Sequence, residues 1–245
     1  MTHSNKSADD LPFLEDGVFR DRGAVNTRLE TFVDAAFAFT LTLLVISFDS
    51  VPTTFDELTY ALRLTPAFLA SFALLMMFWF AHRSWSRRYG LDGAAAALIS
   101  MALVFILLVY VFPLRSIASA ALARMTGGWV PLELKITEEG QARGLFVIYA
   151  VGFMLASYCM AALYYYAYRV RDMLRLSDAE SFLTRMDVYS WIIIGSTGIV
   201  SMVLAVVLPG QWLGLAGWSY ALLGIIMPLF GAWISRQLRT RFGRD

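Results

Sequence analysis

The chain has 245 residues, of which 58% are hydrophobic, 15% are aromatic and only 16% are charged. This composition is too apolar for an ordinary soluble domain, so the sequence indicates an integral membrane protein. The single cysteine, Cys159, excludes an intrachain disulfide and a cysteine-based metal site. The only histidines are His3 and His82, which argues against a zinc site. We expect no bound metal and no nucleic-acid partner.

The sequence has none of the patterns that are typical of an enzyme. It contains no nucleophile paired with a base at a known motif spacing and no glycine-rich phosphate loop. The apolar runs contain no cluster of polar residues that resembles a catalytic site. We therefore predict that the protein is not an enzyme and needs no cofactor.

Uncharged runs, bounded by charges or by Pro and Gly, predict an all-α polytopic membrane fold. Residues 1–27 are polar and are expected to form a cytoplasmic N-terminal tail. A six-helix transmembrane domain is predicted over residues 28–238, followed by a basic cytoplasmic tail over residues 239–245. The predicted spans are residues 30–48, 64–81, 93–117, 144–168, 188–208 and 212–235.

The distribution of basic residues predicts the orientation of these spans. Of the 20 Lys and Arg residues, 15 fall on the side that holds the two termini and five fall on the other side. Because loops rich in basic residues stay on the cytoplasmic side of a membrane, both termini are expected in the cytoplasm. The basic C-terminus could also attract anionic lipid headgroups, although its charge serves equally to orient the last span.

The first predicted span carries a carboxylate, Asp34, near its N-terminal end. A charged group at this depth is expected to face protein or water and to have a partner. His82 and Arg83 end the second span at a similar depth, so either one could bond to Asp34 and tie the two spans together. A proton-handling site that uses Asp34 and His82 is the alternative interpretation.

At helical spacing the first span has two distinct faces. Asp34 lies on one of them, and apolar side chains gather on the opposite one. The apolar stripe consists of Phe32, Phe39, Leu43 and Ile46, with Thr42 at its edge. On this pattern alone, such a stripe is more often ordinary packing or lipid contact than the lining of a pore.

Three stretches resemble the TMEM175 family of potassium channels, also known as the DUF1211 domain. Arg28, Phe32 and Asp34 in "RLETFVDAAFAFTLTLLVISF" match the RxxxFSD signature that opens the family's first span. The stretch "FWFAHRSW" is similar to the end of its second span, and "VYVFPLRS" is similar to the proline end of its third. The resemblance covers about residues 28–235, and it departs from the signature at Val33, where the family usually has Ser.

This resemblance implies a potassium-selective channel in a prokaryotic plasma membrane, built as a homotetramer whose first spans line one central pore. It implies that apolar collars of Phe39, Leu43 and Ile46 constrict the pore and that Thr42 contributes to selectivity. Phe39 is larger than the Ile usual at its position, which favours a tight constriction. Two alternatives remain open: a proton channel or proton-coupled carrier that uses Asp34 and His82, and a non-conducting scaffold subunit of a membrane assembly.

Overall fold

The computed structural model describes residues 11–15, 17–46 and 52–243, without the side chain of Ile46. Within these residues the fold is all-helical, apart from one isolated antiparallel bridge between Phe13 and Arg20. In chain order the helices are α1 (Arg28–Ile46), α2 (Phe55–Arg63), α3 (Thr65–Tyr89), α4 (Ala94–Met125), α5 (Glu139–Arg169), α6 (Asp178–Val207), η2 (Gly210–Trp212), α7 (Gly214–Trp218), η3 (Ser219–Leu222) and α8 (Leu223–Phe242).

Five described segments are long and apolar enough to cross a membrane. They are Thr65–Tyr89, Ala94–Met125, Glu139–Arg169, Asp178–Val207 and Gly210–Phe242, the last of which joins the short helices around residue 215 to α8. Helix α1 is not among these five, and the first predicted span ends at Phe48, outside the described residues. The structure therefore agrees with an all-helical integral membrane protein.

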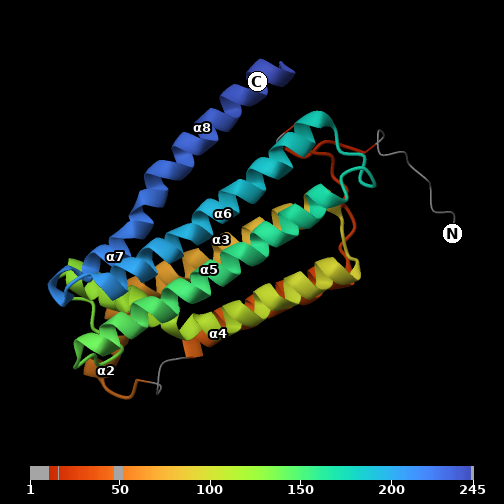
Figure 1. Cartoon of the computed structure of the whole chain (residues 1–245). Coiled ribbons are helices and arrows are strands. Elements are labelled where there is room, and N and C mark those ends of the chain that lie inside the picture. Colours follow the sequence, from red (N-terminus) through yellow and green to blue (C-terminus); the bar gives the residue numbers. More distant parts are fainter. Residues whose placement is uncertain (1–10, 16, 47–51, 244–245) are drawn as a thin grey trace.

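The long helices run side by side as an elongated bundle (Figure 1). Helix α8 lies on the outside of the bundle, where it contacts α6 but buries none of its own side chains. The last turn of α8 packs beside the first turns of α6, because the Phe182 and Phe242 rings are 6.0 Å apart. The described N-terminal residues contact the same turns of α6. Both described chain ends thus lie at one end of the bundle, called here the terminal end.

The observed helices extend beyond the predicted spans at several boundaries. Helix α6 begins ten residues before Val188, because Ser177 and Glu180 form a capping box that starts a helix there. Helix α4 continues through Pro113 to Met125, eight residues beyond the predicted end of the third span at Ile117. A proline inside a transmembrane helix is tolerated where neighbouring groups compensate for the lost hydrogen bond.

The core of the bundle is aromatic and joins α3 to two later helices. Phe78 of α3 stacks on Trp191 of α6, with ring centroids 5.5 Å apart. Trp85 is fully buried, and its indole nitrogen donates a hydrogen bond of 2.9 Å to the carbonyl oxygen of Leu163 in α5. A buried indole needs such a partner, because an unsatisfied N–H inside the protein is costly. These contacts make α3 a rigid support for its neighbours.

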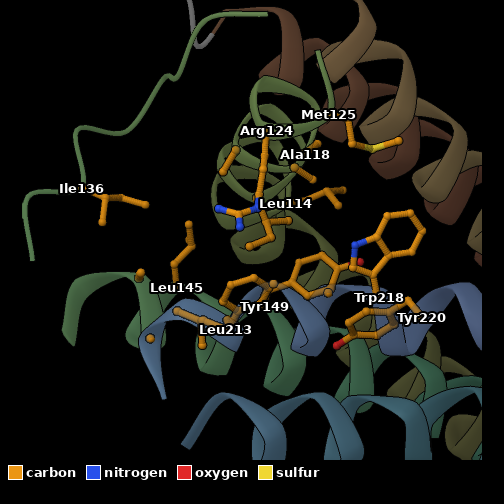
Figure 2. A pocket seen from close by; sticks show the side chains of 18 of the residues that line it. Leu114, Ala118, Arg124, Met125, Ile136, Leu145, Tyr149, Leu213, Trp218 and Tyr220 are labelled. Carbon is orange, nitrogen blue, oxygen red and sulfur yellow. The ribbon is translucent and has the colours of Figure 1, made fainter. Parts of the chain in front are cut away.

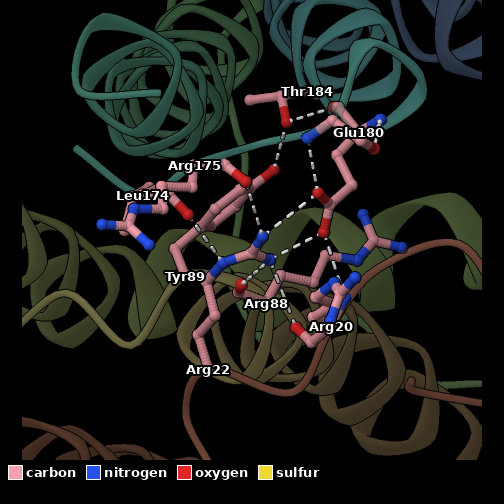
Figure 3. A network of polar contacts seen from close by, with 9 residues as sticks. Arg20, Arg22, Arg88, Tyr89, Leu174, Arg175, Glu180 and Thr184 are labelled. Atoms are coloured by element: carbon pink, nitrogen blue, oxygen red, sulfur yellow. Dashed lines mark hydrogen bonds and ion pairs between the residues drawn. The ribbon is translucent and has the colours of Figure 1, made fainter. Parts of the chain in front are cut away.

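Residues 11–15 and 17–27, called here the N-terminal strap, are packed against the bundle. At the centre of this contact the Arg22 guanidinium meets the Glu180 carboxylate in a bidentate pair, with distances of 2.7 and 3.1 Å (Figure 3). The two side chains are only 7% and 2% exposed. The Nε of Arg22 also donates to the carbonyl oxygen of Leu174. Each polar group of this buried pair therefore has partners, as burial of charge requires.

A close backbone crossing fixes the strap to the end of α3. The amide nitrogen of Gly23 donates to the carbonyl oxygen of Arg87 at 3.0 Å. A Cβ at Gly23 would lie 2.4 Å from the carbonyl oxygen of Ser86, so no other residue fits there without a backbone shift. Gly90, which ends α3 with a φ of +58°, faces Arg22 in the same crossing. The strap is therefore anchored five residues before α1 begins.

Candidate pore-lining helix

Helix α1 presents one face to its own subunit. Val33, Phe37, Thr40 and Leu44 follow one another at intervals of three or four residues, and all four are buried. They pack against α3 and α4. The family's signature serine is replaced here by Val33, whose side chain lies in the apolar core, where a hydroxyl would need a partner. This face holds α1 in place.

The other face of α1 is left uncovered by the described residues. Phe39 is 57% exposed and Phe32 is 52% exposed, and Thr42 and Val45 lie on the same side. Leu43 is only half-buried and packs at the edge of the core, between the two faces. The side chain of Ile46 lies outside the described residues. Phe39 and Thr42 thus share the uncovered face, whereas Leu43 lies at its border.

The hydroxyl of Thr42 has its hydrogen directed at the backbone. Its Oγ1 lies 2.7 Å from the carbonyl oxygen of Phe39 and 2.9 Å from that of Ala38. A hydroxyl has one hydrogen to donate and two lone pairs that accept. Because the hydrogen is used within α1, the oxygen of Thr42 keeps its acceptor capacity for water or a cation on the uncovered face.

Asp34 has a partner on α3, but not a residue that the sequence analysis named. The indole nitrogen of Trp79 donates a hydrogen bond of 2.8 Å to Oδ1 of Asp34. The Arg83 guanidinium lies over the Trp79 ring, with Cζ 5.4 Å from the ring centroid. His82 is buried and bonds to Ser100 of α4, with 2.9 Å between Nε2 and Oγ. The hydrogen bond that joins Asp34 to α3 is therefore made by Trp79, whereas His82 bonds to α4.

The reason for this correction is the position of Trp79 along α3. It precedes His82 by three residues and Arg83 by four, so it lies on the same side of the helix about one turn earlier. This turn lies at the depth of Asp34, while Arg83 is exposed. Among the remaining signature residues, Arg28 is exposed in the first turn of α1.

The far end of α1 is held by a residue that the sequence analysis did not single out. Arg115 of α4 is buried, and its Nη1 donates a hydrogen bond of 3.0 Å to the carbonyl oxygen of Leu44. This carbonyl belongs to the last described turn of α1, and Arg115 joins that turn to α4. Arg115 also forms an ion pair with Glu133 in the loop after α4. The position of Arg115 beside an apolar run indicated that its side chain needs a partner. The sequence did not indicate that this partner is the carbonyl oxygen of Leu44.

Glu30 is a second residue of interest that the pattern did not distinguish. Its side chain is buried in the first turn of α1, and its Oε2 has no hydrogen-bond partner among the described residues. The backbone N–H of Glu30 donates a hydrogen bond of 3.1 Å to Oγ1 of Thr27. A carboxylate near a helix N-terminus is favoured by the helix dipole, which accounts for its place in the first turn.

Comparison with known proteins agrees with this arrangement. The family described as "Endosomal/lysosomal potassium channel TMEM175" matches residues 28–113, which begin where α1 begins. A protein of Marivirga tractuosa named "Potassium channel" is 31% identical over 230 residues, which is 90% of this chain and 92% of that protein. Both descriptions are of ion channels rather than enzymes, as the sequence analysis predicts for this chain.

A solved structure has the same fold. It is a crystal structure of a variant of the potassium channel MtTMEM175 in complex with a nanobody–MBP fusion protein. The two chains superpose with a TM-score of 0.76 and share 30% identity, and the match covers 89% of this chain and 97% of the other. The similarity in sequence and in fold extends over nearly the whole length of both relatives. The chain therefore belongs to the TMEM175 family of potassium channels.

Proposed function

We propose that the chain forms a potassium-selective channel, as a homotetramer in which the α1 helices of four subunits line one central pore. The observation that carries this proposal is the uncovered face of α1, where Phe39 and Thr42 are exposed and the described part of the subunit does not cover them. The two relatives are named as potassium channels, which supports the choice of ion. Potassium is then the permeant ion, and no cofactor takes part.

In this proposal α1 is the first of six spans, and both termini lie in the cytoplasm of a prokaryotic cell. An even number of crossings is supported by the terminal end, where the strap and the last turn of α8 meet the same turns of α6. The excess of Lys and Arg on this side supports the orientation.

Phe39 forms the narrowest apolar collar of the proposed pore. A ring of four phenyl groups offers no hydrogen bond to water or to a hydrated cation, so a narrow ring excludes both. Leu43 lies at the border of the uncovered face, so a small rotation of α1 about its axis brings it into or out of the pore. Ile46 is proposed as the third collar from the family pattern alone. Opening then requires rotation or tilt of α1.

Thr42 is the proposed selectivity residue. It follows Phe39 by three residues, so the two lie about one turn apart on the same face. Its oxygen keeps lone pairs that can replace part of the hydration shell of a cation, as other channels do with carbonyl oxygens. Four such oxygens around an axis favour potassium over sodium only weakly, because a hydroxyl ring is less polar than a ring of carbonyls.

The contacts of Asp34 and His82 support a channel over a proton pathway. Asp34 accepts its hydrogen bond from Trp79, and His82 bonds to Ser100, so the two residues are engaged with different neighbours. A relay would need them linked to each other or through water. We assign both residues to the positioning of α1 and α3.

The proposal is tested by potassium flux from liposomes that contain the purified protein. Phe39→Ala is expected to raise the flux several-fold, because it widens the narrowest collar. Phe105→Ala is the matched control: Phe105 is exposed on α4 and lies outside the proposed pore. If both variants are tetrameric and Phe39→Ala leaves the flux unchanged, α1 does not line the pore. A rise with Phe105→Ala alone would place the pore elsewhere.

Selectivity is tested in the same liposomes by comparison of potassium with sodium. Thr42→Val keeps the shape of the side chain but removes the hydroxyl oxygen, so the preference for potassium is expected to fall. Thr42→Ser keeps the oxygen and is expected to keep the preference. Equal selectivity in wild type and Thr42→Val would remove Thr42 from the proposal and leave the collars untouched.

A further inference from the structure

A large cavity lies at the end of the bundle opposite to the terminal end. It has a volume of about 980 Å³ and is bounded by α3, α4, α5 and residues 210–220 (Figure 2). Most of its wall is apolar, and Leu114, Leu145, Leu213, Tyr149 and Trp218 contribute large side chains to it. The volume is comparable with that of binding sites for sizeable organic ligands.

Small residues leave room for this cavity. Gly210, Gly214 and Gly217 line it from the segment before α8, and Ala118 lines it from α4. A Cβ at Gly214 would still be 3.8 Å from the Nε of Arg124, in ordinary contact. The Arg124 side chain therefore reaches from the last turn of α4 across the cavity toward residues 210–220, as Figure 2 shows.

The rim of the cavity carries two charges that have no partner among the described residues. The guanidinium of Arg124 makes no hydrogen bond or ion pair with them, and the same holds for the carboxylate of Glu138. Glu139 also lines the cavity, but it is neutralised by Arg143, whose Nε lies 3.0 Å from its Oε1. The rim thus offers one unpaired positive and one unpaired negative charge above an apolar interior.

The depth of these charges matches that of lipid headgroups. Arg124 lies in the last turn of α4 and Glu138 precedes the first turn of α5, and both helices are long and apolar enough to cross a membrane. The ends of such helices lie at the boundary between headgroups and acyl chains. The cavity is apolar inside and charged at its rim. A phospholipid has the same arrangement, with apolar acyl chains below a charged headgroup.

We propose that this cavity binds one zwitterionic phospholipid per subunit. One acyl chain fills the apolar interior, the phosphate accepts hydrogen bonds from Arg124, and the cationic end of the headgroup lies near Glu138. An anionic lipid would satisfy Arg124 but would bring its charge close to the Glu138 carboxylate, so the rim favours a headgroup without net charge. The proposal does not depend on which ion the protein conducts.

The test is native mass spectrometry of the intact protein in detergent, with phosphatidylethanolamine, phosphatidylcholine or phosphatidylglycerol added. The expected result is one retained lipid per subunit for either zwitterionic lipid and less retention of phosphatidylglycerol. Arg124→Gln is expected to lower the retention of the zwitterionic lipids about tenfold, because it removes a hydrogen bond from a charged group. Arg185→Gln, at an exposed arginine outside the cavity, is the matched control and should have no effect.

A second pair of variants tests the apolar part of the site. Ala118→Phe fills the cavity and is expected to abolish retention of the lipid, whereas Ala95→Phe places the same ring on an exposed position of the same helix and should not. The proposal is overturned if wild type retains no lipid, if phosphatidylglycerol is preferred, or if Ala118→Phe retains as much as wild type. If Ala118→Phe instead disrupts the oligomer, a second copy of the chain occupies the cavity and the lipid proposal is wrong.

Discussion

The two ends of the helix bundle are held in different ways. At the terminal end a buried, bidentate pair of Arg22 and Glu180 ties the N-terminal strap to α6. At the opposite end the contacts between α2 and the loop after α4 are exposed, as in the hydrogen bonds from Arg63 to the carbonyl oxygens of Gly128 and Trp129. The cavity of about 980 Å³ also lies at this end.

This difference between buried and exposed contacts indicates which end of the bundle resists movement more strongly. Separating the strap from α6 would leave a charge buried without its partner, which costs several kcal/mol. Rearranging the opposite end exchanges exposed hydrogen bonds for bonds to water, at little cost. Arg115 is an exception at that end, because it is buried and bonds both to the end of α1 and to Glu133. The following variants test the contrast, from the largest expected effect to the smallest.

Glu180→Gln is expected to lower the free energy of unfolding by about 3–5 kcal/mol, because the charge of Arg22 would stay buried without a counterion. Equilibrium unfolding of the purified protein in a denaturing detergent measures this change. Asp172→Asn is the control: Asp172 is 89% exposed in its pair with Arg171, and its loss is expected to cost less than about 1 kcal/mol. Equal losses in the two variants would contradict the view that burial makes the Arg22–Glu180 pair the stronger contact.

Arg115→Gln is expected to lower the free energy of unfolding by about 2–3 kcal/mol, since a charged hydrogen bond to the end of α1 and the ion pair with Glu133 are lost together. The same unfolding experiment applies. Lys135→Gln offers a control at the same end, because Lys135 is exposed and its loss is expected to change stability by less than about 0.5 kcal/mol. A loss in the control as large as that of Arg115→Gln would mean that charge, rather than the contact to α1, is responsible.

Trp79→Phe is expected to cost about 1–2 kcal/mol, because the ring is kept while the hydrogen bond to the half-buried Asp34 is lost. The control is Trp233→Phe on α8, where the indole is exposed. Flux measurements on the same samples are also informative, since Trp79 joins α1 to α3. If Trp79→Phe unfolds like wild type, the hydrogen bond contributes nothing to the position of α1.

The smallest expected effect is a pH dependence of α2 at the opposite end. The pKa of Glu57 is lowered because its carboxylate receives hydrogen bonds from the backbone and the hydroxyl of Thr53, and from the backbone of Thr54. Because the pKa is lowered in the folded state, the ionised Glu57 carboxylate stabilises α2 at pH values above the unfolded pKa. This stabilisation is lost as the pH falls through the folded pKa. Hydrogen exchange of the α2 amides, corrected for intrinsic rates, should therefore accelerate in acid, and Glu57→Gln should remove this dependence.

Much of the fold follows from local properties of the sequence. Long uncharged runs predict the five described segments that can cross a membrane, because a spanning helix must be apolar over about 20 residues. Asp34 was expected to have a partner because a charge at this depth is costly, and it accepts a hydrogen bond from Trp79. The uncovered position of Phe39 and Thr42 agrees with the stripe that the helical period predicts.

The contacts between distant residues could not be predicted from the sequence. Arg22 and Glu180 are 158 positions apart, and nothing in the local pattern of either residue indicates the other. The strap was expected to be a tail because its composition is polar, although Phe19 within it is fully buried. The choice of Trp79 over His82 depends on the relative shift of α1 and α3 along their axes, which periodicity leaves undetermined.

The close backbone crossing at Gly23 and Gly90 holds the chain in place just before α1 begins. Only residues 24–27 link the fixed Gly23 to the start of α1, so any tilt of α1 has its pivot at this end. A helix of 19 residues is about 28 Å long. A tilt of about 10° about this pivot would move the other end of α1 by about 5 Å, close to one helical turn. If the channel opens by such a tilt, the hydrogen bond from Arg115 to Leu44 lies at the end that travels farthest, so it must break or Arg115 must follow the helix.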